Sequence, residues 1–286
     1  MAEEADKSCE GDLEREDEDE DGGPPMSKAL NPRDHAKEFE PRIYLDSFYA
    51  SAHEDSAMQM IIFFLPGLAL QIPKGGRLLD VGSGPTIHVP LTFRNVMDEF
   101  YLSDYAAQNR EYLKRWWQNR PDIFQWTKVA KWIEVLEGDC NTSDTMEDEA
   151  RQKVKAILGV DVLKSQLVFS QFPPEAAVPG QFHVVTSIFC LEYASQTAAD
   201  YFKAVANVAK RVKPGGYLIL GGCINEGSYY FGGKRFLSHP LSHEDIAGAL
   251  RNAGMPWKRT ENDGPGLTYK LIDNGGVFIL ISRKPK

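Results

Sequence analysis

Apolar residues from about residue 34 onward follow two patterns. In residues 51–70 they recur every three to four positions, which predicts an amphipathic helix, and Gly75-Gly76 follows as a break. The same spacing predicts helices over residues 106–119, 197–212 and 242–253, the last with Ser242 as its N-cap.

Short, continuous apolar runs separate these helices and have the length of buried strands. We predict strands over residues 77–82, 100–104, 182–189, 217–220 and 277–282. Residues 131–136 are a candidate third strand, residues 144–158 a polar, acidic helix, and residues 159–162 a strand that enters a loop. This alternation predicts an α/β fold with a doubly wound, mostly parallel sheet and helices on both faces, whose ligand lies outside the carboxyl ends of the strands.

The first 26 residues differ from the rest in composition. They contain the run Glu14-Arg15-Glu16-Asp17-Glu18-Asp19-Glu20-Asp21 and almost no apolar residues, which predicts a disordered acidic tail over residues 1–26 and one domain over residues 27–286. Much of the net charge of −9 therefore belongs to the tail. A basic, apolar leader is missing, so the segment does not resemble a signal peptide.

Several classes of function are disfavoured by composition. No basic patch indicates nucleic-acid binding, and no apolar stretch reaches the roughly 20 residues that span a bilayer. The four cysteines, Cys9, Cys140, Cys190 and Cys223, lie far apart without metal-ligand spacing, and the histidines show none either. We expect a cytoplasmic protein with reduced thiols, without a bound metal, and monomeric.

The main chemical motif is the run from Leu79 to Thr86, in which a predicted buried strand ends at Gly82-Ser83-Gly84. Two glycines allow a sharp turn and a close approach of a ligand to the backbone. A dinucleotide fingerprint would require a third glycine where Ile87 stands, and Pro85 is foreign to it, so a dehydrogenase is a remote alternative.

Two acidic positions follow later strands. Asp104 ends the second strand, where a carboxylate can accept the hydroxyls of a ribose. Asp161-Val162 follows the next predicted strand, where the carboxylate could accept the amino group of adenine. Each acid could also be an ordinary loop residue, but the order of glycine turn and two acids indicates a nucleoside cofactor.

Further motifs give these features a family context. They are Phe39-Glu40-Pro41-Arg42-Ile43-Tyr44-Leu45 with Tyr49, Gly82-Ser83-Gly84-Pro85-Thr86, Asp104-Tyr105 with Asn109, Asp161-Val162 with Ser165-Gln166, Phe189-Cys190-Leu191-Glu192 and Lys213-Pro214-Gly215-Gly216. Over residues 39–284 the chain resembles the family of nicotinamide, phenylethanolamine and indolethylamine N-methyltransferases. The resemblance implies a seven-stranded, Rossmann-like class I methyltransferase fold and S-adenosylmethionine as the cofactor.

The resemblance also implies roles for matched positions. Tyr44 and Tyr49, which on residue type alone would be core residues, would close over the methionine carboxylate of the cofactor. The residues implied around the cofactor are Tyr44, Tyr49, Gly82, Ser83, Thr86, His88, Asp104, Tyr105, Asn109, Asp161, Val162 and Ile188. Two of them depart from the family pattern: His88 replaces the usual Tyr, and Ile188 replaces a polar residue of the nicotinamide enzyme.

Methyl transfer from a sulfonium needs no enzyme nucleophile, but the acceptor nitrogen must be unprotonated. An alkylamine must shed a proton, so carboxylates near the acceptor matter, and Glu192 and Asp273 are the candidate catalytic residues. Glu192 could instead be a helix-start acid, and Asp273 a turn residue before Asn274-Gly275-Gly276. The substrate-binding set that the resemblance implies is Phe189, Glu192, Glu226, Tyr230, Ser238 and Asp273.

The acceptor signals point in two directions. Both carboxylates match acidic residues of the phenylethanolamine enzyme and favour a primary or secondary amine of the phenylethanolamine or tryptamine type. Ser238 matches a serine of the nicotinamide pocket, which leaves nicotinamide or another pyridine open. A protein that binds S-adenosylmethionine without turnover is a further alternative.

Overall fold

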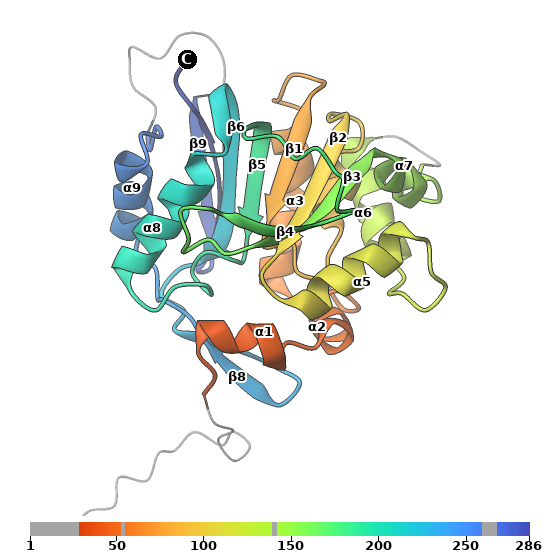
Figure 1. Ribbon diagram of the computed structural model, residues 1–286, viewed down its shortest axis with the longest axis horizontal. Coiled ribbons are helices and arrows are strands. Elements are labelled where there is room, and N and C mark those ends of the chain that lie inside the picture. The colour runs from red at the N-terminus through yellow and green to blue at the C-terminus, as the bar shows by residue number, and fades with distance from the viewer. Residues whose placement is uncertain (1–28, 53–54, 139–141, 259–267) are drawn as a thin grey trace, which may run out of the picture.

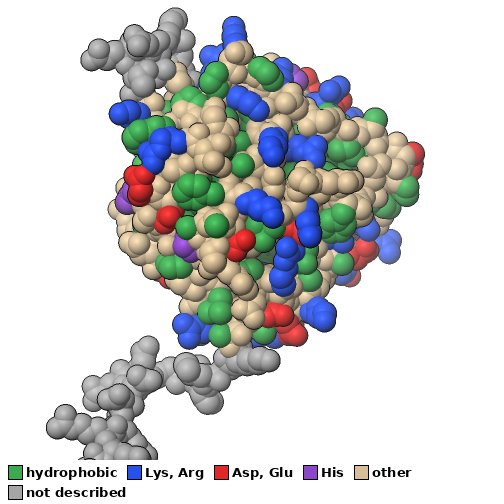
Figure 2. Space-filling model, turned by 60° about the vertical axis from the view of Figure 1, so that its left-hand side comes forward, with side chains coloured by type: hydrophobic (Ala, Val, Ile, Leu, Met, Phe, Trp, Pro, Cys, Tyr) green, Lys and Arg blue, Asp and Glu red, His purple; other side chains and the backbone are tan. Residues whose placement is uncertain are grey.

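The computed structural model describes residues 29–52, 55–138, 142–258 and 268–286. The acidic segment predicted to form a tail, residues 1–26, lies outside the described residues. Residues 1–28 hold 12 of the 41 acidic and 3 of the 32 basic residues, so the remainder carries 29 of each sign. On the face in Figure 2, Lys and Arg side chains gather over the middle, and acidic side chains are fewer.

An eight-stranded sheet forms the centre of the molecule, in the order β4-β3-β2-β1-β5-β6-β10-β9 (Figure 1). Its parallel strands are β1 (Arg77–Val81), β2 (Glu99–Asp104), β3 (Val154–Val160), β5 (Phe182–Ile188) and β6 (Val212–Cys223). The antiparallel strands are β4 (Val168–Phe172), β9 (Tyr269–Asn274) and β10 (Val277–Arg283). The order reverses at β1, so the carboxyl ends of β1, β2 and β5 meet at a switch point.

The sheet has one strand more than the seven expected. Neither of its two edge strands was predicted from the pattern of apolar residues. Strands β4 and β9 each expose or half-expose all of their residues. An edge strand without a buried face needs no apolar run, so hydrophobic periodicity cannot reveal it. The mostly parallel α/β architecture is confirmed.

Helices cover both faces of the sheet (Figure 1). They are α1 (His35–Glu38), α2 (Pro41–Phe48), α3 (Ser56–Ala69), α4 (His88–Phe93), α5 (Ala107–Trp117), α6 (Thr127–Glu137), α7 (Met146–Lys153), α8 (Ala198–Ala209) and α9 (His243–Asn252), with a 3-10 turn at Pro32–Asp34. Neighbouring residues of β1 enter different cores: Leu78 joins the cluster that contains Ile61 of α3, and Leu79 joins the one that contains Val205 of α8. The alternation of side chains along a strand produces these two layers.

Two predicted elements were wrong. Residues 131–136, expected as a strand, lie inside α6, where Val129, Ala130 and Ile133 are buried at helical spacing. The predicted helix over residues 144–158 ends at Lys153, and β3 begins at Val154 and pairs with β2. Short apolar runs fit either period: residues 131–136 pack as a helix against α3 and α4, whereas residues 154–160 pair with β2.

A small hairpin and the N-terminal segment close the carboxyl edge of the sheet. Strands β7 (Ser228–Phe231) and β8 (Lys234–Leu237) form the hairpin. Leu30 pairs with β8 through two backbone bonds of 2.8 Å, to Arg235 and Leu237. Figure 1 shows α1, α2 and β8 together below the sheet. Among the residues described, no helix combines the length and apolar character needed to cross a bilayer.

Arg94, at the end of α4, should be the most sensitive charged residue of the fold. Its side chain is fully buried and donates to Glu137 at 2.8 and 2.7 Å and to Glu149 at 3.2 Å. Removing one partner of a buried ion pair leaves an uncompensated charge, so Arg94→Met should lower the free energy of unfolding by about 3 kcal/mol.

Urea unfolding measures this loss, and Arg77→Met is the matched control. Arg77 also pairs with a glutamate, Glu99 at 2.9 Å, but its side chain is 48% exposed. An exposed pair contributes about 1 kcal/mol or less. Equal losses in the two variants would contradict the importance assigned to burial of Arg94.

Candidate cofactor and acceptor site

One cavity lies at the carboxyl edge of the sheet, where β1, β2, β3, β5 and β6 end. The N-terminal segment and the loop after β6 complete its lining. Every residue predicted around the cofactor lines this cavity: Tyr44, Tyr49, Gly82, Ser83, Thr86, His88, Asp104, Tyr105, Asn109, Asp161, Val162 and Ile188. The sheet therefore gathers residues spread from position 44 to position 188.

The turn after β1 is shaped by glycine. Gly82 and Gly84 have φ of 72° and 60°, a backbone region that favours glycine. A Cβ on Gly82 would also collide with Sγ of Cys190, so the loop after β5 packs directly against the turn. The Ser83 N–H donates to the Ser103 carbonyl at 2.8 Å, and the Thr86 hydroxyl donates to the Ser83 carbonyl at 2.7 Å.

Asp104 is held rigidly at the end of β2. Its Oδ1 accepts from the Ala106 N–H at 2.8 Å and from Asn109 Nδ2 at 3.1 Å, and its Oδ2 accepts from the Gly84 N–H at 2.8 Å. Burial raises the pKa of Asp104, and these hydrogen bonds oppose the rise. A buried, oriented carboxylate of this kind is suited to accept ribose hydroxyls.

Asp161 and Tyr105 both contact Arg33, which was not among the predicted site residues. The Arg33 guanidinium donates to Asp161 Oδ2 at 2.8 Å and lies over the Tyr105 ring at 5.2 Å from its centroid. The Leu163 N–H donates to the other carboxylate oxygen of Asp161. The N-terminal segment thus covers the end of the cavity where the sequence predicted adenine.

Two buried polar atoms test whether the site fits the cofactor. In the described structure, His88 Nε2 and Asn109 Oδ1 are buried without a hydrogen-bond partner. Nδ1 of His88 shares a 3.2 Å hydrogen bond with the Tyr49 hydroxyl, and burial lowers the pKa of His88 to about 4. Unpartnered buried atoms on a cavity lining are costly unless a ligand meets them. The carboxylate and amine of a methionine moiety offer such partners, so the residues present fit S-adenosylmethionine.

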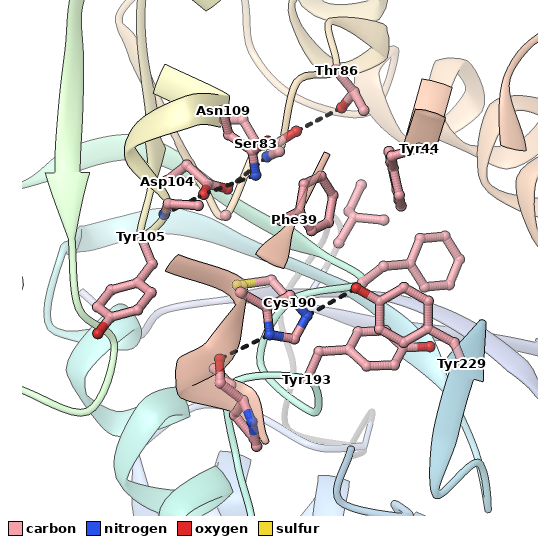
Figure 3. A pocket seen from close by; sticks show the side chains of 18 of the residues that line it. Phe39, Tyr44, Ser83, Thr86, Asp104, Tyr105, Asn109, Cys190, Tyr193 and Tyr229 are labelled. Atoms are coloured by element: carbon pink, nitrogen blue, oxygen red, sulfur yellow. Dashed lines mark hydrogen bonds between the residues drawn. The ribbon is translucent and has the colours of Figure 1, made fainter. Parts of the chain in front are cut away.

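Aromatic rings line the opposite end of the cavity. Figure 3 shows Tyr193 and Tyr229 together there, away from Ser83, Asp104 and Asn109. The two rings have centroids 4.5 Å apart. Phe189 and Glu226, two of the predicted substrate residues, also line the cavity.

Glu192 is buried behind this aromatic end. Its Oε1 accepts from the Cys223 N–H at 3.2 Å, and a side chain at Gly222 would collide with the carboxylate. Burial raises the pKa of Glu192 to about 7, although backbone hydrogen bonds oppose the rise. The carboxylate is therefore next to the cavity lining at Cys223 and not on the cavity surface.

Besides Glu192, three predicted substrate residues lie outside the cavity. Asp273 is on the edge strand β9, and its carboxylate bonds His243 Nε2 at 2.5 Å. Tyr230 is 61% exposed and packs against Arg235, because alternation along β7 sends its neighbours Tyr229 and Phe231 to the other face. Ser238 donates to the Glu226 carbonyl at 2.7 Å and so supports the loop that bears Glu226.

Several residues that line the cavity were absent from the prediction, among them the polar residues Arg33, His35, Asp55, Tyr193 and Tyr229. Asp55 caps α3 by accepting from the Met58 N–H at 2.9 Å, and a capping acid gives no sign of facing a ligand. For Tyr229 a signal existed, since one of two adjacent tyrosines in a strand must point inward. Sequence reasoning selected the other one.

The sequence comparisons agree with this site. Residues 27–285 match the model of the NNMT/PNMT/TEMT family, so the chain belongs to that family. Nicotinamide N-methyltransferase of Caenorhabditis elegans is 38% identical over 255 residues, covering 88% of this chain and 91% of that protein. Human phenylethanolamine N-methyltransferase is 31% identical, covering 86% and 89%. Rabbit (Oryctolagus cuniculus) indolethylamine N-methyltransferase is 29% identical, covering 88% and 95%.

Solved structures show the same fold at low identity. The CurJ carbon methyltransferase has a TM-score of 0.54 and 11% identity, covering 90% of this chain and 62% of that chain. An S-adenosylmethionine-dependent methyltransferase from Clostridium acetobutylicum has a TM-score of 0.50 and 9% identity, covering 85% and 98%. The chain is therefore an S-adenosylmethionine-dependent N-methyltransferase, and the predicted family, fold class and cofactor are confirmed.

Gly82→Ala should sharply weaken binding of S-adenosylhomocysteine, measured by isothermal titration. The substitution adds a clash with Cys190 to the strain of a positive φ. Gly138→Ala is the control, because Gly138 has a φ of 70° but open space around its Cβ position. The control should lose about 1 kcal/mol of stability and no affinity. Unchanged binding by Gly82→Ala would contradict the role of this turn.

Glu192→Gln should stabilise the protein in a pH-dependent way. The pKa of Glu192 is raised by folding, so the folded state binds its proton more tightly than the unfolded state. Stability from this group is therefore present below the unfolded value near 4.5 and is lost as the pH rises through about 7. The variant should melt above the wild type at pH 8 and close to it at pH 4.5, by calorimetry. A constant difference would show that Glu192 does not titrate as inferred.

Proposed function

We propose that this N-methyltransferase acts on a small primary or secondary amine, with the amine nitrogen at the aromatic end of the cavity. The observation that carries the proposal is the charge of the lining. Asp55 and Glu226 line the cavity, and Glu192 lies just behind it. Within the described part of the chain, Arg33 is the only Lys or Arg of the lining, and it is bound to Asp161 at the other end.

This arrangement suits a cationic molecule with an aromatic body. Carboxylates attract an ammonium group, and the rings of Tyr193 and Tyr229 can pack against an apolar ring or a cation. A neutral pyridine would gain little from Asp55 or Glu226. The charge of the cavity therefore favours an amine over a heterocycle.

S-adenosylmethionine supplies a methyl group on a positively charged sulfur when it is bound. The acceptor nitrogen forms the new bond with its lone pair as the carbon–sulfur bond breaks, so an ammonium must first lose a proton. We assign proton acceptance to the carboxylates of this end, with Glu226 at the surface and Glu192 behind it. The pKa of Glu192, about 7, keeps both protonation states accessible near neutral pH, as a general base requires.

The cofactor end has a separate task. Tyr44, Tyr49 and the turn at Gly82 would hold the methionine part, and Asp104 would hold the ribose. Asp161 and Val162 would flank the adenine. Burial of Tyr49, Asp104 and Val162 would keep water away from the reacting methyl group and strengthen the electrostatic contacts inside.

A pyridine acceptor such as nicotinamide is the second candidate. It is favoured by the 38% identity to the Caenorhabditis elegans nicotinamide N-methyltransferase. Ser238, which the sequence matched to a serine of the nicotinamide pocket, donates to the Glu226 carbonyl and does not line the cavity.

The proposal retains the expectation of a cytoplasmic monomer. Gel filtration would test the oligomeric state, and cell fractionation would test the localisation.

A panel of phenylethylamine, phenylethanolamine, tryptamine, nicotinamide and quinoline with labelled cofactor tests the acceptor class. Primary amines should give the highest kcat/KM. Glu226→Gln should lower kcat/KM for the amines by about tenfold, the equivalent of losing one charge-assisted contact of roughly 1.4 kcal/mol, and leave quinoline unchanged.

Asp273→Asn is the matched control for this panel. It removes a carboxylate of the same chain that is bound to His243 outside the cavity, and it should leave the ratio of amine to quinoline turnover unchanged. Turnover of the pyridines alone by the wild type would overturn the amine proposal.

A further inference from the structure

His35 and Tyr229 form a hydrogen-bonded pair at the aromatic end of the cavity. Both line the cavity, and Nε2 of His35 lies 2.9 Å from the Tyr229 hydroxyl. The other ring nitrogen, Nδ1, lies 2.8 Å from the Pro32 carbonyl oxygen. The pair therefore links the N-terminal segment to the β7–β8 hairpin across the acceptor end.

The Pro32 carbonyl fixes the tautomer of His35. A carbonyl oxygen can only accept, so Nδ1 must carry a proton and donate it. Burial lowers the pKa of His35, so the ring is neutral near pH 7 and Nε2 has a free lone pair. Nε2 consequently accepts, and the Tyr229 hydroxyl donates its only proton to His35.

The surroundings hold both partners in place. Gln108 Nε2 donates to the His35 carbonyl at 2.8 Å, and the His35 ring packs on Phe236 with centroids 4.6 Å apart. The Tyr229 ring stacks on Phe231 at 5.7 Å and on Phe236 at 5.3 Å. Neither side chain can turn away without disrupting this aromatic packing.

We propose that His35 makes the Tyr229 oxygen an obligate hydrogen-bond acceptor, so that the enzyme selects acceptor nitrogens that carry an N–H. The inference rests on the proposed function. An N–H of a primary or secondary amine can donate to this oxygen while the lone pair stays free to attack. A pyridine or neutral tertiary amine has no N–H to offer.

The locked proton has a second consequence for the reaction. A free tyrosine hydroxyl beside the acceptor could donate to the nitrogen and occupy the lone pair that must form the new bond. His35 prevents this competition, and so it is a positioning residue that acts through Tyr229. Methylation should accordingly stop at the tertiary amine.

The experiment uses phenylethylamine, its N-methyl and N,N-dimethyl derivatives, and quinoline as acceptors. The wild type should methylate the first two and leave the dimethyl derivative unquaternised. Tyr229→Phe should lower kcat/KM for phenylethylamine by about three- to tenfold, as expected for one neutral hydrogen bond, with quinoline turnover unchanged. Tyr230→Phe is the matched control, since it removes the neighbouring hydroxyl outside the cavity, and it should not change the ratio.

A double variant tests whether His35 acts by orienting the Tyr229 hydroxyl or only by supporting the fold. His35→Phe should lower kcat for phenylethylamine because Tyr229 can then donate to the amine, and the double variant with Tyr229→Phe should recover part of that kcat. A double variant no better than His35→Phe alone would overturn the inference. Thermal protection by S-adenosylhomocysteine verifies that each variant is folded. If His35→Phe is not folded, the ratio of phenylethylamine to quinoline turnover by Tyr229→Phe still tests the inference.

Failure of the inference differs from failure of the proposed function. If the wild type methylates phenylethylamine and Tyr229→Phe leaves its ratio to quinoline unchanged, the amine function stands and the inference is wrong. If the wild type methylates quinoline and none of the amines, both are wrong.

Discussion

The hydrogen bond from the Gly84 N–H to Asp104, together with the one from the Ser83 N–H to the Ser103 carbonyl, joins the turn after β1 to the end of β2. These bonds form only when the two parallel strands are in register, because Val81 pairs with Ser103. The glycine turn and the Asp104 carboxylate are thereby fixed as one rigid unit. Every other contact proposed for the cofactor is arranged around this unit.

The acceptor end is built on different principles. Its residues come from the N-terminal segment, the loop after β5 and the β7–β8 hairpin, and aromatic packing around Phe231 and Phe236 brings them together. Segments of this kind can vary in sequence without disturbing the sheet. A family can therefore keep one cofactor site and change its acceptor, which agrees with the different acceptors named in the three relatives.

Charge is distributed between the two ends according to their tasks. Arg33 is paired with Asp161 at the end proposed for adenine, whereas Asp55, Glu226 and the buried Glu192 place carboxyl groups at or behind the end proposed for the acceptor. The neutral His35 accepts the hydrogen bond of the Tyr229 hydroxyl and so fixes the orientation of that O–H group. Attraction and orientation are thus supplied by separate groups.

The sequence by itself determined most of the parallel core and the residues proposed to hold the cofactor. Apolar runs marked the parallel strands β1, β2, β5 and β6, and each proposed cofactor residue lies in or beside such a run or in a family motif. In a parallel sheet the strand ends must meet at one edge, so local motifs were sufficient to bring Gly82, Asp104 and Asp161 together.

Tertiary structure alone decided the edge strands and the acceptor end. Strands β4 and β9 have no buried face, and Asp273 and Tyr230 were assigned to the substrate site without knowledge of the side that they face. Which tyrosine of the hairpin points inward depends on the packing of β7 against Phe236 and the N-terminal segment. Long-range contacts set that orientation, and residue spacing does not encode them.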